Sequence, residues 1–395
     1  MKSDNSAARR TAKIFLDANE CDVADLAALT SRSVNKADYP YSADVQKNVL
    51  IYDCNAIRAV ITDAHSRKAV MAEWADALME GPGVIVLKYA ETGHAMIDQA
   101  SDIFRDIIDE QHRTNTGGGD HFAKPGANDR IWNSLEKHCL KDPDNFAAYY
   151  GNEMLALISE AWLGPFYQMT AQLNVVNPGG AAQSPHRDYH LGFQSAQDVE
   201  RYPRAVHLFS PMLTLQGAIA HVDAPMESGP TLLLPFSQMY EAGYLATGRQ
   251  DFRDFFQARH VQLPLEKGDM LFFSPALFHA AGTNRSKDIK RMVNLFQVSS
   301  AYGRAMETID RVAMSKALYP VLLAAQHSLN PAKIDAAIAS CAEGYPFPTN
   351  LDRDPPLGGL APESQAILFK ESLLSNLDPD VFNAALEAHS AKRIS

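Results

Sequence analysis

The chain has 395 residues, of which 46% are hydrophobic and 21% charged, so we expect a globular, soluble protein with a sizeable core. Its formal net charge of −11 argues against nonspecific binding to nucleic acid or to an anionic membrane, because both select basic surfaces. The four cysteines lie far apart without a CxxC pair, which disfavours a thiolate metal site and indicates a reduced compartment. Neither a signal-type apolar region nor a membrane-spanning run is evident, and we expect a cytoplasmic protein.

The first part of the chain, residues 5–80, has a helical pattern. In "SRKAVMAEWADALMEG" the apolar residues Val70, Trp74 and Leu78 fall on one helical stripe, and a glycine follows as a stop. The next run, "GVIVLKY" at 83–89, is short, β-branched and bounded by glycine. It therefore predicts a buried strand.

Helices are expected over 91–113 and 133–163, with a Gly-, Asn- and Asp-rich loop between them. From about residue 166 short strand-like runs such as "FYQMTAQLNVV", "GPTLLLP" and "RMVNLFQVSS" alternate with turn residues, which predicts an all-β sandwich or barrel. After about residue 303 the helical pattern returns. We therefore divide the chain into an N-terminal helical segment (1–80), a β core with helical insertions (81–302) and a C-terminal helical extension (303–395), packed as one compact unit.

The segment "SPHRDYH" leads out of the strand pattern "AQLNVVNPGG". If it is extended, side chains alternate, so His186 and Asp188 face one way and Arg187 the other, with a salt bridge as its default role. A third ligand must come from a second strand, and His279 in "GDMLFFSPALFHAAGTN" is the best candidate. Two histidines and one carboxylate on one face of an ion, with the remaining positions open, form the facial triad of non-haem Fe(II) oxygenases.

A second triplet of the same kind, His221-Val-Asp223, shows that the pattern alone is weak evidence. It runs into a short turn between two buried strands, so we interpret Asp223 as a turn residue that bonds to nearby backbone N–H groups. Taken alone, His186 and Asp188 would also be interpreted as part of a turn, and His279 as a half-buried histidine at a strand end. The order of the surrounding strands favours metal ligation for these three.

A cation at the start of the strand after His279 would bind the carboxylate of an anionic co-substrate. Arg291 opens the pattern "RMVNLFQ" and is our choice, with Lys290 and Arg285 as alternatives. The competing interpretation of Arg291 is a surface charge on an edge strand.

Together these segments resemble the phytanoyl-CoA dioxygenase-like family of Fe(II)/2-oxoglutarate-dependent oxygenases. The resemblance covers about residues 80–300 and rests on "QLNVVNPGG" before "SPHRDYH", on "HVDAPMESGPTLLLPFSQ", on "KGDMLFFSPALFHAAGTN" and on "RMVNLFQ". It implies an α+β, mainly β fold, a double-stranded β-helix (jelly roll) flanked by N- and C-terminal helices. It also implies Fe(II) on His186, Asp188 and His279, with 2-oxoglutarate chelating the iron.

The resemblance further assigns the far carboxylate of 2-oxoglutarate to Arg291 and matches Gln172 to a position that often touches this co-substrate. The basic residue falls one position later than the family spacing, so Lys290 stays an alternative. Gln238 replaces a histidine that is usual in the family, at a position we interpret as structural. Asp188 stands where related halogenases carry a small residue, which favours hydroxylation over halogenation.

The implied reaction consumes O₂ and 2-oxoglutarate, releases succinate and CO₂, and hydroxylates an unactivated C–H bond of a small organic substrate. One alternative is another metal-dependent jelly-roll enzyme, such as a hydrolase or isomerase, which needs no 2-oxoglutarate anchor. Another is a non-catalytic jelly-roll binding protein. We expect no nucleic-acid or membrane partner, and the helical ends offer a surface for a homodimer.

Candidate substrate residues adjoin the triad. His190 faces the same way as His186 if the strand stays regular, although a hydrogen-bonded structural histidine is as good an interpretation. Tyr189 and Phe193 line the pocket or belong to the core, and for Phe193 we favour the core. The loop "GDHFAKPGANDRIWN" is either a plain solvated loop or a substrate lid, because loops on rigid β scaffolds often carry binding residues. Its candidate residues are His121, Arg130 and Trp132.

Overall fold

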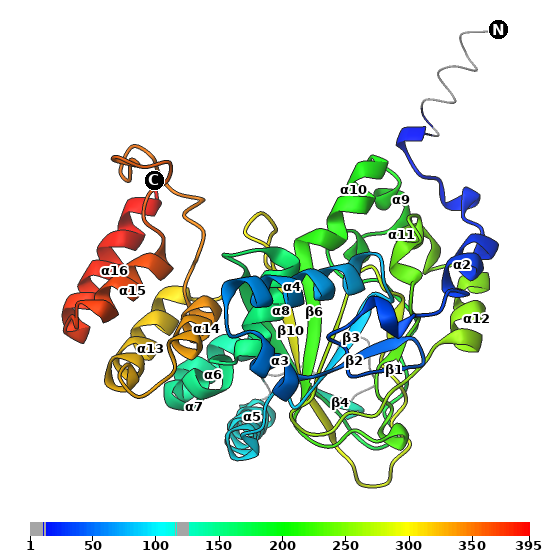
Figure 1. The fold of residues 1–395 in the computed structure, drawn as a ribbon, viewed down its shortest axis with the longest axis horizontal. Coiled ribbons are helices and arrows are strands. Elements are labelled where there is room, and N and C mark those ends of the chain that lie inside the picture. Colours follow the sequence, from blue (N-terminus) through cyan, green and yellow to red (C-terminus); the bar gives the residue numbers. More distant parts are fainter. Residues whose placement is uncertain (1–10, 12, 115, 117–125) are drawn as a thin grey trace, which may run out of the picture. The chain divides into compact units, whose positions relative to one another are not determined.

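The computed structural model describes residue 11, residues 13–114, residue 116 and residues 126–395 (Figure 1). The chain divides into two compact units. Unit 1 takes residues 1–90, 119–129 and 174–293, and unit 2 takes 91–118, 130–173 and 294–395. Three strands have residues in both units: β4 (Asn128–Ile131), β5 (Gln168–Val176) and β10 (Arg291–Ser299). The division of the chain at residues 80 and 302 stays a prediction. The two compact units group residues that lie together, which does not show which segments fold independently.

Unit 1 holds most of the strands and the short helices that connect them. Its other strands are β1 (Asp44–Gln46), β2 (Val49–Asp53), β3 (Val84–Lys88), β6 (Thr214–Ala220), β7 (Leu232–Leu233), β8 (Met270–Phe273) and β9 (His279–Ala280). Its α-helices are α2 (Val23–Thr30), α3 (Cys54–Val60), α4 (Ala64–Met79), α9 (Ala196–Val199), α10 (Arg204–Phe209), α11 (Gly243–Ala246) and α12 (Gln250–Arg259).

The large sheet of unit 1 has the order β1-β2-β3-β8-β6. Its pairings are antiparallel except for β2 and β3, which run parallel with Leu50 opposite Ile85. Parallel neighbours need a crossover, and the helices α3 and α4 supply it. All residues of β3 except Lys88 are buried, as the β-branched run in the sequence predicts.

A small second sheet carries one residue of the predicted triad. In it β7 pairs antiparallel with β9, and single bridges add His186 opposite His279 and Val261 opposite Leu233. Apolar side chains from both sheets form one buried cluster, which includes Val84, Val86, Leu233, Leu271, Phe273 and Leu277. Two sheets packed over a shared core, with helices around them, confirm the predicted helix-flanked jelly-roll core.

The N-terminal part differs from the prediction in one respect. The sequence pattern indicates helices over 5–80, and α2, α3 and α4 are there, but the strands β1 and β2 interrupt them. Lys47 and Asn48 both have positive φ, 51° and 65°, and they join the two strands as a two-residue hairpin turn. Asparagine tolerates this backbone conformation, so the "KN" pair before the apolar run "VLIY" was the signal for a hairpin.

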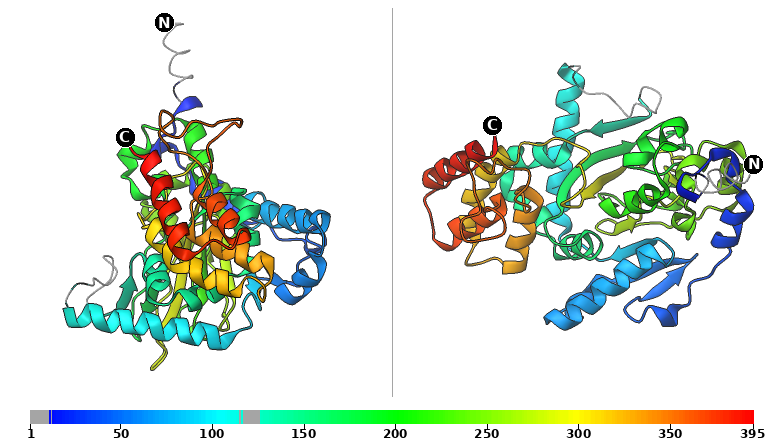
Figure 2. Two further views of the ribbon diagram at one scale, coloured as in Figure 1. Left: turned by 90° about the vertical axis from the view of Figure 1, so that its left-hand side faces the viewer. Right: turned by 90° about the horizontal axis from the view of Figure 1, so that it is seen from above.

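Unit 2 is mainly helical. Its helices are α5 (His94–Thr114), α6 (Ser134–Lys141), α7 (Pro143–Tyr150), α8 (Glu153–Leu163), α13 (Arg311–Ala325), α14 (Pro331–Cys341), α15 (Gln365–Leu374) and α16 (Pro379–Arg393). These elements confirm the helices predicted over 91–113, over 133–163 and after 303. The last four pack against one another, as Figure 2 shows for the C-terminal end of the chain. None of the helices within the described residues is long and apolar enough to cross a membrane.

Candidate metal centre

The backbone brings the two predicted histidines side by side. The N–H of His186 donates to the carbonyl of His279 at 3.0 Å, and the N–H of His279 donates back to the carbonyl of His186 at 3.2 Å. Asp188 is held two residues further on, where its N–H donates to the carbonyl of Pro275 at 3.2 Å. A reciprocal bridge of this kind is an antiparallel pair, so the side chains of both histidines lie on one side of the small sheet.

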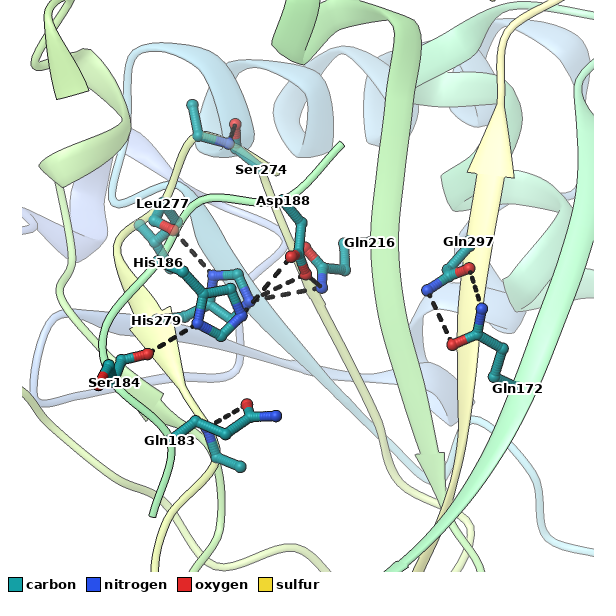
Figure 3. Close-up of polar contacts among 12 residues, drawn as sticks. Gln172, Gln183, Ser184, His186, Asp188, Gln216, Ser274, Leu277, His279 and Gln297 are labelled. Carbon is teal, nitrogen blue, oxygen red and sulfur yellow. Dashed lines mark hydrogen bonds and ion pairs between the residues drawn. The ribbon is translucent and has the colours of Figure 1, made fainter. Parts of the chain in front are cut away.

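Three potential ligand atoms converge at this bridge. His186, Asp188 and His279 each offer one such atom, and these atoms all lie within 4.8 Å of one another. His186 Nε2 is 3.6 Å from Asp188 Oδ1, and His279 Nε2 is 3.3 Å from Asp188 Oδ2 (Figure 3). Among the described residues, this is the one group of His, Cys, Asp or Glu side chains with the geometry of a metal site.

Backbone carbonyls determine which ring nitrogen of each histidine is available. Nδ1 of His186 lies 2.9 Å from the carbonyl oxygen of Ser184, and Nδ1 of His279 lies 2.9 Å from that of Leu277. Because a carbonyl only accepts, each Nδ1 carries the proton, and in the neutral ring Nε2 keeps its lone pair. Lone pairs on both Nε2 atoms then face a carboxylate, and this arrangement calls for a cation between them.

The carboxyl group of Asp188 stays ionised in this setting. Burial by itself would raise the pKa of Asp188, but the positive charge of the His186 and His279 imidazoles in their protonated form, together with the amide of Gln216, holds that pKa below its ordinary value. The donor set is therefore two imidazole nitrogens and one carboxylate oxygen, which fits an ion such as Fe(II) that accepts nitrogen and oxygen ligands.

Arg187 points away from the three ligand atoms, as strand alternation predicts, but it does not form the expected salt bridge with any of the residues that the structure describes. Its side chain is buried, and one Nη2 donates to the carbonyls of Ser237 and Tyr240, both at 2.7 Å. The guanidinium also lies over the rings of Tyr244 and Phe278, each 5.0 Å from the ring centroid. Burial lowers the pKa of Arg187 to about 10, so the group stays charged at neutral pH.

Arg291 and Lys290, the two candidate anchors, have different environments. Lys290 is exposed, whereas Arg291 is only 5% exposed and donates to the carbonyl of Ser228 at 3.3 Å. Within the described part of the chain, no carboxylate forms an ion pair with Arg291, and burial lowers its pKa to about 10. A buried guanidinium without a carboxylate partner is costly unless an anion binds there.

The second triplet has a different environment. The N–H of His221 donates to the carbonyl of Met292 at 3.0 Å, and the side chain of His221 is buried. Asp223 is exposed and accepts a bond at 2.9 Å from the N–H of Lys267. Asp223 thus accepts from a backbone N–H, as expected, but the expectation of a nearby donor is wrong for this contact, because Lys267 is distant in the sequence.

Three of the predicted cofactor and substrate residues cluster in unit 2. Arg130 donates to the amide oxygen of Gln172 at 2.5 Å, and its guanidinium lies 4.5 Å from the ring centroid of Trp132. The amide nitrogen of Gln172 donates to the side-chain oxygens of Gln297 at 3.0 Å and of Glu307 at 3.3 Å. Gln172 is fully buried within this network, and its contact with the co-substrate stays a prediction.

The residues just after Asp188 leave the regular strand. Tyr189 and His190 have positive φ, 63° and 46°, and the 3₁₀ helix η3 (His190–Phe193) begins there. The regular strand on which the placement of His190 beside His186 depended is therefore absent at this residue. The contact of His190 Nε2 with the hydroxyl of Thr214, at 3.2 Å, agrees with the alternative of a hydrogen-bonded histidine. Tyr189 is buried, whereas Phe193, which we assigned to the core, is 57% exposed. His121 lies outside the described residues.

Sequence reasoning missed one polar side chain that touches the cluster. Gln216 on β6 donates from its amide to Asp188 Oδ2, and its Nε2 lies 3.4 Å from His279 Nε2. The signal was present, because "TLQGAIA" is an otherwise apolar or small-residue strand with one long polar side chain. Gln238, by contrast, donates to the carbonyl of Gly81 at 2.8 Å, at the position we interpret as structural.

A family model decides the relationship of this chain to known proteins. The model described as phytanoyl-CoA dioxygenase (PhyH) matches residues 63–292, which is more than half of the chain. The chain belongs to the phytanoyl-CoA dioxygenase family. The matched range includes all three residues of the metal cluster as well as Gln216, Lys290 and Arg291.

Individual relatives of this PhyH-family chain are more distant. It is 30% identical over 139 residues to an iron/alpha-ketoglutarate-dependent dioxygenase, ausU, of Aspergillus calidoustus, covering 35% of this chain and 41% of the relative. It is 29% identical over 151 residues to the dioxygenase aneA of Aspergillus aculeatus, covering 37% of this chain and 45% of the relative. The matches thus span less than half the length of these relatives.

Solved structures with similarity to this PhyH-family chain include the epimerase SnoN in complex with Fe³⁺, alpha-ketoglutarate and nogalamycin RO. That match has 16% identity and a TM-score of 0.40, and covers 59% of this chain and 84% of that one. EctD from S. alaskensis with bound Fe matches with 16% identity and a TM-score of 0.44, covering 59% of this chain and 78% of that one.

Proposed function

We propose that this chain is an Fe(II)- and 2-oxoglutarate-dependent dioxygenase that hydroxylates an unactivated C–H bond of a small organic molecule. The observation that carries the proposal is the convergence of His186 Nε2, His279 Nε2 and the Asp188 carboxylate within 4.8 Å. Membership of the phytanoyl-CoA dioxygenase family and the similarity to named dioxygenases support it. Succinate and CO₂ are the expected co-products.

The side chains fit a ferrous ion with open coordination positions. His186 and His279 would bind through Nε2, because their Nδ1 protons are committed to backbone carbonyls. Asp188 would supply the third ligand as an ionised carboxylate. Bound iron together with O₂ and 2-oxoglutarate supplies the oxidising chemistry, while the protein holds the ligands and shields the site from water.

Arg291 is the proposed anchor for the far carboxylate of 2-oxoglutarate. Its guanidinium is buried, makes one hydrogen bond to Ser228, and has no carboxylate partner among the described residues. A planar guanidinium binds a carboxylate through two parallel N–H donors, which a flexible ammonium does not do. The exposure of Lys290 argues against it as the anchor. Gln172, from the sequence-based assignment, is retained as a second co-substrate contact.

Hydroxylation is the proposed outcome because Asp188 provides a third protein ligand. If a small residue stood at that position, the metal ion would have a further open coordination position, which a halide could take. The substrate residues proposed from the sequence are His190, Tyr189, Arg130, Trp132 and His121, which bear on the organic substrate rather than on iron. The proposed partner is a small-molecule substrate, and we expect neither nucleic acid nor membrane, because the net charge of −11 disfavours nonspecific binding to polyanionic surfaces.

Succinate release tests the proposal. Purified chain with Fe(II), ascorbate, O₂ and 2-oxoglutarate is offered a panel of small organic compounds, and succinate is quantified with each. We expect substrate-dependent succinate in the wild type and none in His186→Ala. Oxygen-independent turnover of an ester or sugar with Zn(II) or Mn(II) would instead support the hydrolase or isomerase alternative. Metal binding without any turnover would support the non-catalytic one.

A further inference from the structure

Gln216 is a polar side chain, outside the three predicted ligands, that contacts two of them. It lies in the middle of β6, two residues after Thr214. Its amide nitrogen donates to Asp188 Oδ2 and is 3.4 Å from His279 Nε2 (Figure 3). The two N–H groups of one amide therefore meet lone pairs on two of the three ligand side chains.

The orientation of this amide follows from its partners. Turning the amide over would place Gln216 Oε1 against the Asp188 carboxylate and the His279 lone pair, so that three acceptors would face one another. With Nε2 toward the cluster, Oε1 is buried and, within the described residues, has no hydrogen-bond partner. A buried carbonyl oxygen without a hydrogen-bond donor costs free energy. Either the bond to Asp188 outweighs this cost, or a bound group donates to Oε1.

The contact determines how Asp188 can bind a cation. A carboxylate binds a metal either through one oxygen or through both. A donor on Oδ2 competes with a metal ion for the lone pairs of that oxygen and so favours binding through Oδ1, the oxygen 3.6 Å from His186 Nε2. Binding through one oxygen keeps one more coordination position open, and a bidentate keto acid plus O₂ need three such positions in an octahedral site.

We propose that Gln216 is a positioning residue that holds Asp188 to one-oxygen coordination and thereby keeps a coordination position open for 2-oxoglutarate and O₂. The inference rests on the proposed function. The bond to His279 belongs to the metal-free site, because Nε2 gives its lone pair to a bound ion. The bond to Asp188 Oδ2 persists when the ion binds.

The test uses Mn(II) as a probe of the intact chain, with Gln216→Leu as the variant and Gln262→Leu as the matched control. Both glutamines are half-buried in unit 1, and Gln262 donates to the carbonyl of Pro230 at 2.6 Å rather than to the cluster. Water proton relaxation by bound Mn(II) reports the number of exchangeable water ligands. Titration of the Mn(II) complex with 2-oxoglutarate reports the affinity of the co-substrate.

Gln216→Leu should lower the relaxivity of bound Mn(II), because Asp188 then occupies a second position. It should weaken 2-oxoglutarate binding by about 10- to 100-fold, the range by which removing an outer partner of a metal ligand typically lowers metal affinity or activity. Gln262→Leu should match the wild type in both measurements. Unchanged relaxivity and unchanged 2-oxoglutarate affinity in Gln216→Leu would overturn the inference, provided that the variant unfolds thermally near the wild-type temperature.

Gln216→Glu is a second variant that tests the inference if Gln216→Leu does not fold. The ionised carboxylate is nearly isosteric, cannot donate to Asp188, and adds an anionic ligand beside the site. We expect tighter Mn(II) binding but weaker 2-oxoglutarate binding, a divergence that a merely structural glutamine would not produce. If the wild-type chain binds neither Mn(II) nor Fe(II), the proposed function itself fails. If the wild type binds metal and Gln216→Leu matches it in relaxivity and 2-oxoglutarate affinity, only the inference on Gln216 fails.

Discussion

Two triplets of identical pattern, His186-Arg-Asp188 and His221-Val-Asp223, have different environments in the same unit. The side chain of His186 is 33% exposed and faces the ligand atom of His279, whereas His221 is buried at 1%. Asp188 is held by side chains of the cluster, whereas Asp223 accepts a backbone N–H from Lys267. The local pattern supplies two side chains, but only a second strand at the right register supplies the third.

The largest expected difference between the two triplets is in metal binding. His186→Ala removes one of three converging donors and should abolish stoichiometric Fe(II) binding, while His221→Ala should keep it. Isothermal titration of the anaerobic chain with Fe(II) measures both. Retained binding in His186→Ala together with lost binding in His221→Ala would mean that the second triplet is the metal site.

The middle residues of the triplets should differ in their contribution to stability. Arg187→Met leaves the carbonyls of Ser237 and Tyr240 without their buried charged donor, which should cost roughly 3 kcal/mol of unfolding free energy. Val222→Ala, at a half-buried position, should cost about 1 kcal/mol or less. Urea unfolding followed by circular dichroism compares them, and equal costs would mean that the buried hydrogen bonds of Arg187 contribute no more to stability than the packing of Val222.

Arg291 and Lys290 are a second pair of similar residues with different environments, one buried and one exposed. Arg291→Ala should raise the KM for 2-oxoglutarate about 10- to 100-fold, the effect of losing a charged hydrogen bond to a carboxylate. Lys290→Ala removes an exposed charge and should change that KM by less than about twofold. Steady-state kinetics at fixed substrate and Fe(II) measure both values, and equal shifts would reject the assignment.

The smallest expected effect concerns Asp223. Asp223→Ala loses one exposed hydrogen bond to the N–H of Lys267, so the unfolding free energy should fall by about 1 kcal/mol or less. Fe(II) affinity should be unchanged, since Asp223 lies outside the cluster. A fall in Fe(II) affinity comparable to that of Asp188→Ala would contradict the distinction between the two carboxylates.

The sequence was sufficient for features set by local pattern and element order. The buried strand at 83–89 follows from its β-branched composition. The convergence of His186, Asp188 and His279 follows from the alternation of side chains along an extended segment, together with a second strand pattern that ends at His279. Their predicted roles as iron ligands await the tests above.

Features set by tertiary contacts were not accessible from the sequence. The guanidinium of Arg187 donates to backbone carbonyls rather than to a carboxylate, and the sequence does not show which backbone carbonyls will lie near a side chain. The positive φ of Tyr189 and His190 breaks the alternation on which the placement of His190 depended, and neither residue type demands that conformation. Gln216 could have been singled out as the long polar residue of β6, but its partner Asp188 could not.

The central claim is that His186, Asp188 and His279 hold one ferrous ion that keeps positions open for 2-oxoglutarate. The most direct measurement is the visible absorption of the anaerobic wild-type chain as Fe(II) is added in the presence of excess 2-oxoglutarate. We predict a weak charge-transfer band that saturates at one iron per chain and is missing in His186→Ala. Iron that binds without producing this band, or a band that survives in His186→Ala, would contradict the account.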